Sequence, residues 1–148
     1  MDKAKYDRGE PCQRYFFGHD NDIQCIAIHP NKRWVATGQQ KKADTDTELK
    51  NPPYVCIWDV DNCNQIQRLD HDTRERSIIC ACFSGDPDAQ DPGRVGGDLL
   101  ITVTSDDKHT IHVWRWMVHE NKYFKAVYIP GWSIGPEKKF KELEDKGW

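Results

Sequence analysis

The pattern most suggestive of catalysis lies near the C-terminus, where Gly131, Ser133 and Gly135 fit the motif Gly-x-Ser-x-Gly. In serine hydrolases this turn exposes a nucleophilic serine, and the acidic residue and the histidine of the triad follow later in the chain. No histidine occurs after His119, so the sequence offers no base in the required order. The motif therefore favours a glycine-flanked turn, and an esterase built on Ser133 stays as the less favoured alternative.

Two other groups of residues could bind a metal ion. The acidic residues of segment 44–48 alternate as in a calcium loop, but Leu49 stands where that loop needs glycine. Cys80 and Cys82 would share one face of a strand, and no Cys-x-x-Cys pair accompanies them. We therefore expect neither a metal ion nor a cofactor. Four cysteines lie in apolar runs and are expected to be small buried residues: Cys25, Cys56, Cys80 and Cys82.

Composition and charge exclude further classes of function. The chain has 148 residues, of which 30% are charged, and its formal net charge is −3. A negative protein is a poor ligand for nucleic acid or for an anionic membrane surface, because both attract positive charge. No run approaches the roughly 18 apolar residues of a membrane span, and the N-terminus shows no secretory signal. We expect a folded cytoplasmic protein with no nucleic-acid or membrane partner.

Two short runs of β-branched and aromatic residues indicate the elements that position the side chains. In residues 54–60 two β-branched residues alternate ahead of Trp58, and the pattern returns in residues 110–116 ahead of Trp114. A period of two is typical of a β-strand with two distinct faces. Because the flanking segments also match in order, the sequence predicts two repeats of one four-stranded unit.

The all-β region is predicted to span residues 14–128, between a polar N-terminal segment (1–13) and a C-terminal tail (129–148) with a short helix. The first apolar run is nearly continuous, which is typical of a strand covered on both faces. The strands of the first unit are expected at residues 23–29, 34–38, 55–60 and 65–69. Those of the second unit are expected at residues 78–83, 99–105, 111–116 and 123–128.

The repeat is longer than the about 40–45 residues of a typical four-stranded propeller repeat, since Trp114 lies 56 positions after Trp58. In the first unit the additional residues lie at positions 39–53, between its second and third strands. In the second unit they lie at positions 85–98, between its first and second strands. These connections leave an up-and-down sheet from opposite ends, so we expect the two insertions on opposite faces of the molecule.

A buried polar chain is expected to hold each unit together. A histidine, a serine or threonine on the second strand and a tryptophan ring N–H can bond in series, and Gly-His followed by Trp-Asp outlines a WD-repeat blade. The candidates in the first unit are His19, Thr37, Trp58 and Asp59. Those in the second unit are Ser105, Asp106 or Asp107, and Trp114. His71 lies farther from its first strand than His19 does and is not expected to complete the second chain.

A narrower similarity covers about residues 14 to 117. Residues 15–30, 36–39 and 53–59 closely resemble the opening blade of the echinoderm microtubule-associated-protein-like family, and residues 81–84, 105–107 and 113–116 do so too. Members of that family look like tandem β-propellers that act on microtubules. The resemblance implies a microtubule-associated protein on the cytoskeleton, with the cilium or axoneme as one setting.

Two units cannot close a ring, so the outer faces of the pair need a further partner. We expect additional blades, supplied by a longer polypeptide, by other copies or by a larger assembly. The predicted function is a non-enzymatic scaffold that binds tubulin, microtubules or an axonemal or cytoskeletal assembly. The alternative is a general WD-repeat adaptor in ubiquitin ligation or trafficking. Candidate contact residues are Lys32, Arg33, Lys41, Lys42, Phe140 and Leu143.

Overall fold

Eight strands form two four-stranded antiparallel sheets in the computed structural model, which describes residues 3, 7–9, 13–42, 52–72, 75–85, 96–106 and 108–129. The first sheet contains β1 (Ile23–Ile28), β2 (Trp34–Gln39), β3 (Tyr54–Asp59) and β4 (Gln65–Asp70). The second contains β5 (Ile78–Phe83), β6 (Leu99–Thr104), β7 (Ile111–Met117) and β8 (Lys122–Ile129). The strands of each sheet are in chain order, so the all-β prediction of two four-stranded units is confirmed. The helix predicted around Phe140 and Leu143 lies outside the described residues.

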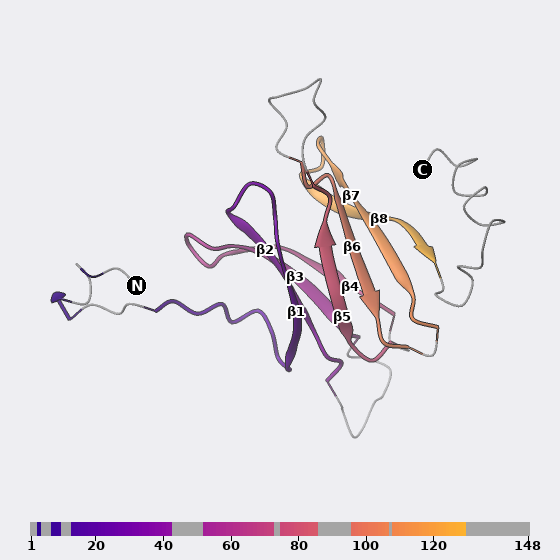
Figure 1. The fold of residues 1–148 in the computed structure, drawn as a ribbon, viewed down its shortest axis with the longest axis horizontal. Coiled ribbons are helices and arrows are strands. Elements are labelled where there is room, and N and C mark those ends of the chain that lie inside the picture. The colour runs from indigo at the N-terminus through magenta and orange to yellow at the C-terminus, as the bar shows by residue number, and fades with distance from the viewer. Residues whose placement is uncertain are drawn as a thin grey trace.

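The two sheets pack face to face, and the core lies between them (Figure 1). Ile57 of the first sheet and Ile78 and Leu100 of the second are fully buried there. β-branched and aromatic side chains pack well on such pleated surfaces, because alternate residues point to the same side. The remaining buried members of this core are Ala36, Val55, Leu69, Phe83, Trp114 and Tyr123.

The two sheets share the same irregularities of pairing. The β1–β2 register shifts between Ile23 and Cys25, and the β5–β6 register shifts between Ile78 and Cys80. A second shift occurs directly before the tryptophan of the third strand, between Ile57 and Trp58 and between Val113 and Trp114. A bulge adds one residue to one strand and increases the local twist. Equivalent bulges at equivalent positions mean that both units follow one backbone plan.

The two long connections leave from opposite ends of the sheets, as the sequence predicts. At the end of β2, Gln40 forms a bridge with Ser77, just before β5. The β5–β6 connection returns at the other end, where Gly97 lies directly against the ring of His29 in the β1–β2 turn. The insertions themselves fall mostly outside the described residues, but their described flanks lie at the expected ends.

The outer faces of the pair are less covered than the sequence predicts. On β1 the side chains of Ile26 and Ile28 are 64% and 65% exposed, although the run predicts a strand covered on both sides. Cys80 and Cys82 on β5 are also exposed, whereas Cys56 is buried as expected. The reason is the same for both strands: each turns one face toward the other sheet and one face away from it.

Candidate functional site

A chain of hydrogen bonds crosses the first sheet from Trp58 to His19. The Trp58 ring Nε1–H donates to Thr37 Oγ1 at 3.1 Å, and Thr37 Oγ1 lies 2.6 Å from His19 Nε2. An indole N–H can only donate, so the threonine hydroxyl accepts from Trp58. The Gln39 amide oxygen beside His19 Nδ1 can only accept, so the neutral ring donates from Nδ1 and its Nε2 accepts the threonine hydrogen. His19 therefore carries its proton on Nδ1, which donates to Gln39 Oε1 at 2.8 Å.

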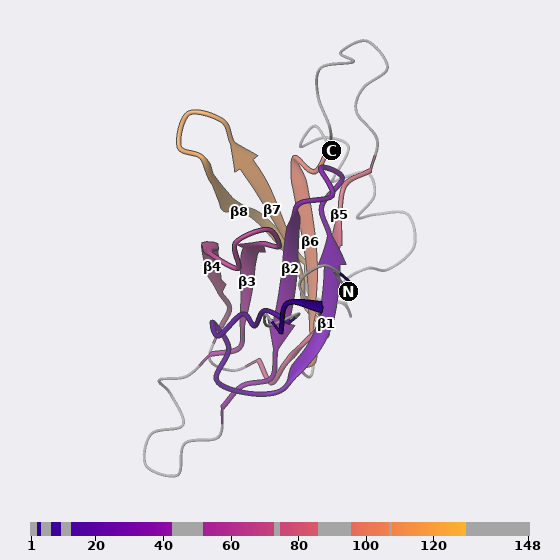
Figure 2. The ribbon, with the colours of Figure 1, turned by 90° about the vertical axis from the view of Figure 1, so that its left-hand side faces the viewer.

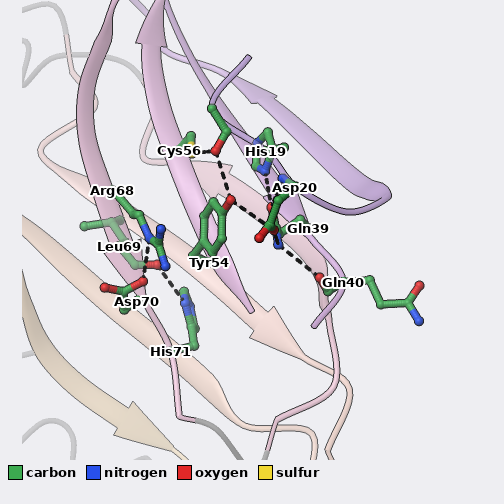
Figure 3. A network of polar contacts seen from close by, with 11 residues as sticks. His19, Asp20, Gln39, Gln40, Tyr54, Cys56, Arg68, Leu69, Asp70 and His71 are labelled. Atoms are coloured by element: carbon green, nitrogen blue, oxygen red, sulfur yellow. Dashed lines mark hydrogen bonds and ion pairs between the residues drawn. The ribbon is translucent and has the colours of Figure 1, made fainter. Parts of the chain in front are cut away.

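The far end of this chain is a buried amide that the sequence analysis missed. Gln39 is fully buried, and its Nε2 donates to Asp20 Oδ1 at 2.7 Å and to the Gln40 carbonyl at 3.2 Å (Figure 3). The Tyr54 hydroxyl lies 2.9 Å from the Gly18 carbonyl and 3.2 Å from Asp20 Oδ1. Gln39 follows Thr37 by two positions, so both side chains share one face of β2. That spacing is the signal that could have identified Gln39.

The segment before β1 brings His19 to the sheet by aromatic stacking. Phe16 lies on the Trp58 indole with ring centroids 4.8 Å apart, and His19 lies on the Tyr54 ring at 5.5 Å. Both pairs are nearly parallel, which gives extensive contact between flat side chains. The segment thereby lies against β3, which carries both Tyr54 and Trp58.

Burial sets the charge states along this chain. Desolvation lowers the pKa of His19, and this effect outweighs the Gln39 hydrogen bond that raises it. The hydrogen bond from Gln39 lowers the pKa of Asp20. Burial, with the nearby Asp20 carboxylate, raises the pKa of Tyr54 to about 12. At neutral pH the His19 imidazole and the Tyr54 phenol are thus neutral. The hydrogen-bonded chain therefore suits a structural role better than proton transfer.

The second sheet repeats the chain with the same atoms in the same order. The Trp114 Nε1–H donates to Thr102 Oγ1 at 3.1 Å, and that hydroxyl lies 2.8 Å from His71 Nε2. His71 Nδ1 lies 3.1 Å from the Leu69 carbonyl, which can only accept, so the tautomer matches that of His19. Burial lowers the pKa of His71 to about 3. This chain joins the end of β4 in one sheet to β6 and β7 in the other.

The hydrogen-bonded chain of the second sheet differs from the prediction in two residues. Thr102, and not Ser105, bonds to Trp114, because β6 ends at Thr104 and Ser105 lies beyond the paired strand. The Ser105 hydroxyl instead lies 2.9 Å from that of Ser77. His71 completes the chain despite its distance in sequence. Asp107 lies outside the described residues.

Asp59 and the predicted basic contacts are placed apart from the polar chains. Asp59 accepts from the Arg33 Nε–H at 2.7 Å and from the Asp61 backbone N–H at 2.8 Å, so it holds the β3–β4 turn. Lys32 and Arg33 precede β2, whereas Lys41 and Lys42 follow it. Six strand residues rise roughly 20 Å, so the structure puts the two basic pairs at opposite ends of the sheet.

A buried acidic residue in the connection between the sheets was also missed. Glu75 Oε1 lies 2.7 Å from His112 Nε2, and both side chains are 4% exposed. Glu75 Oε2 accepts from the Asp72 backbone N–H at 3.0 Å, and the ring of His71 lies 4.8 Å from that of His112. The pair fastens the connection between β4 and β5 to β7. A lone glutamate in a polar segment gives no periodic signal from which this could be predicted.

Within the described residues, no three His, Cys, Asp or Glu side chains are arranged to hold a metal ion. The same part of the chain contains no helix with the length and apolar character needed to cross a membrane.

Taken together, the two equivalent sheets and their His–Thr–Trp chains define a pair of WD-repeat β-propeller blades. Residues 12–127 match the family model described as the first β-propeller of the echinoderm microtubule-associated protein. The chain therefore belongs to the echinoderm microtubule-associated-protein family.

Individual relatives agree with this assignment. The chain is 37% identical to human echinoderm microtubule-associated protein-like 2 over 112 residues, which is 75% of this chain and 16% of that protein. It is 31% identical to mouse echinoderm microtubule-associated protein-like 1 over 115 residues, which is 78% of this chain and 13% of that protein. The chain thus spans a small part of the length of these relatives.

Solved structures show the same fold. The Chaetomium thermophilum Sqt1 protein, bound to the N-terminus of ribosomal protein L10, aligns with a TM-score of 0.57 and 25% identity over 78% of this chain and 26% of its own. The WD40 repeats of RRP9 align with a TM-score of 0.52 and 14% identity over 80% of this chain and 28% of theirs. Both neighbours place the two sheets among WD-type blades.

Proposed function

We propose that this chain is a non-enzymatic interaction module that contacts microtubules, or a cytoskeletal assembly built on them, in the cytoplasm. The family match over residues 12–127 carries the proposal. The polar chains support it, because they use their histidines and tryptophans to join strands and sheets. The module would present its loops from a rigid frame, as propellers do.

The end of the sheets that follows β2 suits an acidic partner better than the opposite end. In the β1–β2 turn, Arg33 Nε lies 2.7 Å from Asp59 and 3.4 Å from Asp61, so its charge is balanced. At the other end, the Lys41 backbone N–H donates to the Arg76 carbonyl at 2.6 Å. That bond brings three basic residues together, and Lys42 among them is exposed. Several cations that lie close together attract an acidic protein surface more strongly than one cation does.

Co-sedimentation with polymerised tubulin tests the proposal. The wild-type chain should pellet with microtubules, and less so as the salt concentration rises. Replacing the basic pair after β2, Lys41→Glu with Lys42→Glu, should reduce pelleting, whereas Lys32→Glu in the opposite turn should not. If the wild type pellets no better than an unrelated control protein, the proposal that this chain binds microtubules is wrong.

The alternative is a WD-repeat adaptor with no microtubule role, and the matched relatives do not favour it. A pull-down dominated by ubiquitin-ligation or trafficking machinery, without tubulin, would support this alternative. Ser133 lies outside the described residues. An esterase assay therefore tests the proposal that the chain is not an enzyme. Loss of a measured esterase activity in Ser133→Ala would overturn it.

A further inference from the structure

The β7–β8 hairpin extends farther than its counterpart in the first sheet. In the first unit Trp58 pairs with Gln65, and the turn closes where the Asp59 N–H donates to the Asn64 carbonyl. In the second unit the equivalent pair, Trp114 with Lys125, is followed by three further pairs: Arg115 with Phe124, Trp116 with Tyr123, and Met117 with Lys122. The last two pairs have no counterpart in the first unit. At about 3.4 Å per residue they lengthen the hairpin by roughly 7 Å, and Figure 2 shows it standing clear of β3 and β4.

One side of this extension is fastened to the first sheet. The Trp116 ring lies 5.3 Å from that of Trp34 and 5.0 Å from that of Tyr123. Gln67 of β4 bonds twice to the backbone of Tyr123: its Nε2–H donates to the carbonyl at 2.8 Å, and its Oε1 accepts from the N–H at 2.7 Å. The Tyr123 hydroxyl donates to the Gly97 carbonyl. The hairpin is therefore held in a fixed orientation.

The other side combines apolar and cationic side chains. Because neighbouring residues of a strand point to opposite faces, the side chains next to the partly buried Trp116 and the buried Tyr123 face away from the first sheet. Met117 and Phe124 are 44% and 47% exposed, and each is paired across the strands with a basic residue. The face, called the hairpin face here, consists of Arg115, Met117, Lys122 and Phe124, with Val118 at the turn.

The charge of this hairpin is opposite to that of the whole chain. Residues 115–125 hold three basic side chains and one acidic side chain, Glu120, whereas the chain has a net charge of −3. The corresponding turn of the first unit carries the carboxylates of Asp59 and Asp61. Two exposed apolar side chains between two cations fit a ligand that offers an apolar side chain flanked by carboxylates.

We propose that the hairpin face binds an acidic peptide segment that carries a large apolar side chain. Lys122 attracts a carboxylate of the peptide, and Met117 and Phe124 cover the apolar side chain. Met has a flexible, polarisable side chain that adapts to different apolar partners. This site is separate from the basic cluster after β2 and does not depend on the microtubule proposal.

Fluorescence anisotropy with a labelled peptide of glutamates around one phenylalanine tests the site. The wild-type chain should bind this peptide and should not bind the version in which lysines replace the glutamates. Lys122→Glu should weaken binding by up to about fivefold, because exposed charge pairs contribute up to about 1 kcal/mol. Met117→Ser with Phe124→Ser should weaken it similarly. Lys108→Glu, an equally exposed lysine at the opposite end of β7, should leave it unchanged.

The same experiment can overturn the proposal in three ways. Equal affinity of the wild type and both hairpin variants would place the peptide elsewhere. Equal affinity for the lysine peptide would remove the charge argument. Loss of self-association in the Met117→Ser, Phe124→Ser variant, with peptide binding unchanged, would assign the face to a second copy of the chain. Circular dichroism checks that each variant keeps its β-structure, and Lys122→Glu alone leaves the apolar part of the face intact.

Discussion

At the scale of single residues, the groups at the two ends fix the direction of each polar chain. The indole N–H can only donate, so Thr37 and Thr102 each accept from a tryptophan. Each histidine presents Nδ1–H to a carbonyl-type oxygen that can only accept, so its Nε2 accepts from the threonine hydroxyl. Neither hydroxyl can be removed without leaving two polar groups unpaired. An unpaired buried group destabilises a protein by about 1–3 kcal/mol.

Thr102→Val should therefore lower the free energy of unfolding by about 2–4 kcal/mol, since its partners His71 and Trp114 are buried. Thr37→Val should have a smaller effect of about 1–3 kcal/mol, because His19 and Trp58 are only partly buried. Urea denaturation measures both. Thr104→Val is the matched control, since the buried Thr104 hydroxyl makes one long bond, of 3.3 Å, to the Thr110 carbonyl. If Thr102→Val lowers the free energy of unfolding no more than Thr104→Val does, the Trp114–Thr102–His71 hydrogen bonds do not stabilise the fold as proposed.

The buried histidines should also make stability depend on pH. A histidine in an unfolded chain titrates near pH 6.5, whereas burial lowers the pKa of His19 and His29 and brings that of His71 to about 3. Below pH 6.5 the unfolded chain thus binds more protons than the folded chain. The free energy of unfolding should be greatest above pH 6.5 and should fall as the pH decreases toward 3.

Denaturation at a series of pH values measures this dependence. His71→Gln should show a shallower fall between pH 6.5 and 5 than the wild type, because one neutral buried imidazole is gone. His119→Gln, at an exposed position in the β7–β8 turn, should follow the wild type. A His71→Gln profile parallel to that of the wild type would show that His71 does not contribute.

At the scale of the elements, the distance between the sheets depends on a glycine of β2. A Cβ atom on Gly38 would lie 2.7 Å from Ile78 Cβ and 2.8 Å from Cys25 Sγ. Gly38→Ala should therefore push the sheets apart and lower the free energy of unfolding by roughly 1–3 kcal/mol. Gly85→Ala is the control, because nothing lies within 4 Å of its Cβ position. Equal denaturation midpoints of the two variants would contradict close packing at Gly38.

The elements were more predictable than the partners of individual side chains. Periodicity located all eight strands, because alternation along a strand is a local property of the sequence. The choice between Thr102 and Ser105 depends on where β6 ends and which residue faces Trp114, and only strand pairing decides that. The exposure of Cys80 could not be predicted either, since an apolar run does not reveal whether neighbouring sheets cover both its faces.

At the scale of the whole molecule, the two outer faces differ in burial from their counterparts between the sheets. Counting from the equivalent bulges, Ile28 of β1 corresponds to Phe83 of β5. Phe83 packs against the first sheet and is 7% exposed, whereas Ile28 has no neighbouring sheet among the described residues and is largely exposed. The same position is thus buried where a second blade adjoins it. Exposed apolar surface of this kind favours association.

We infer that further protein covers the outer faces of this pair of blades. Sedimentation equilibrium of the purified chain, whose mass is 17.3 kDa, is the test. We expect species heavier than the single chain, a mean mass that rises with concentration, and dissociation in an Ile26→Ser, Ile28→Ser variant. A single 17.3 kDa species at every concentration, unchanged in that variant, would contradict it.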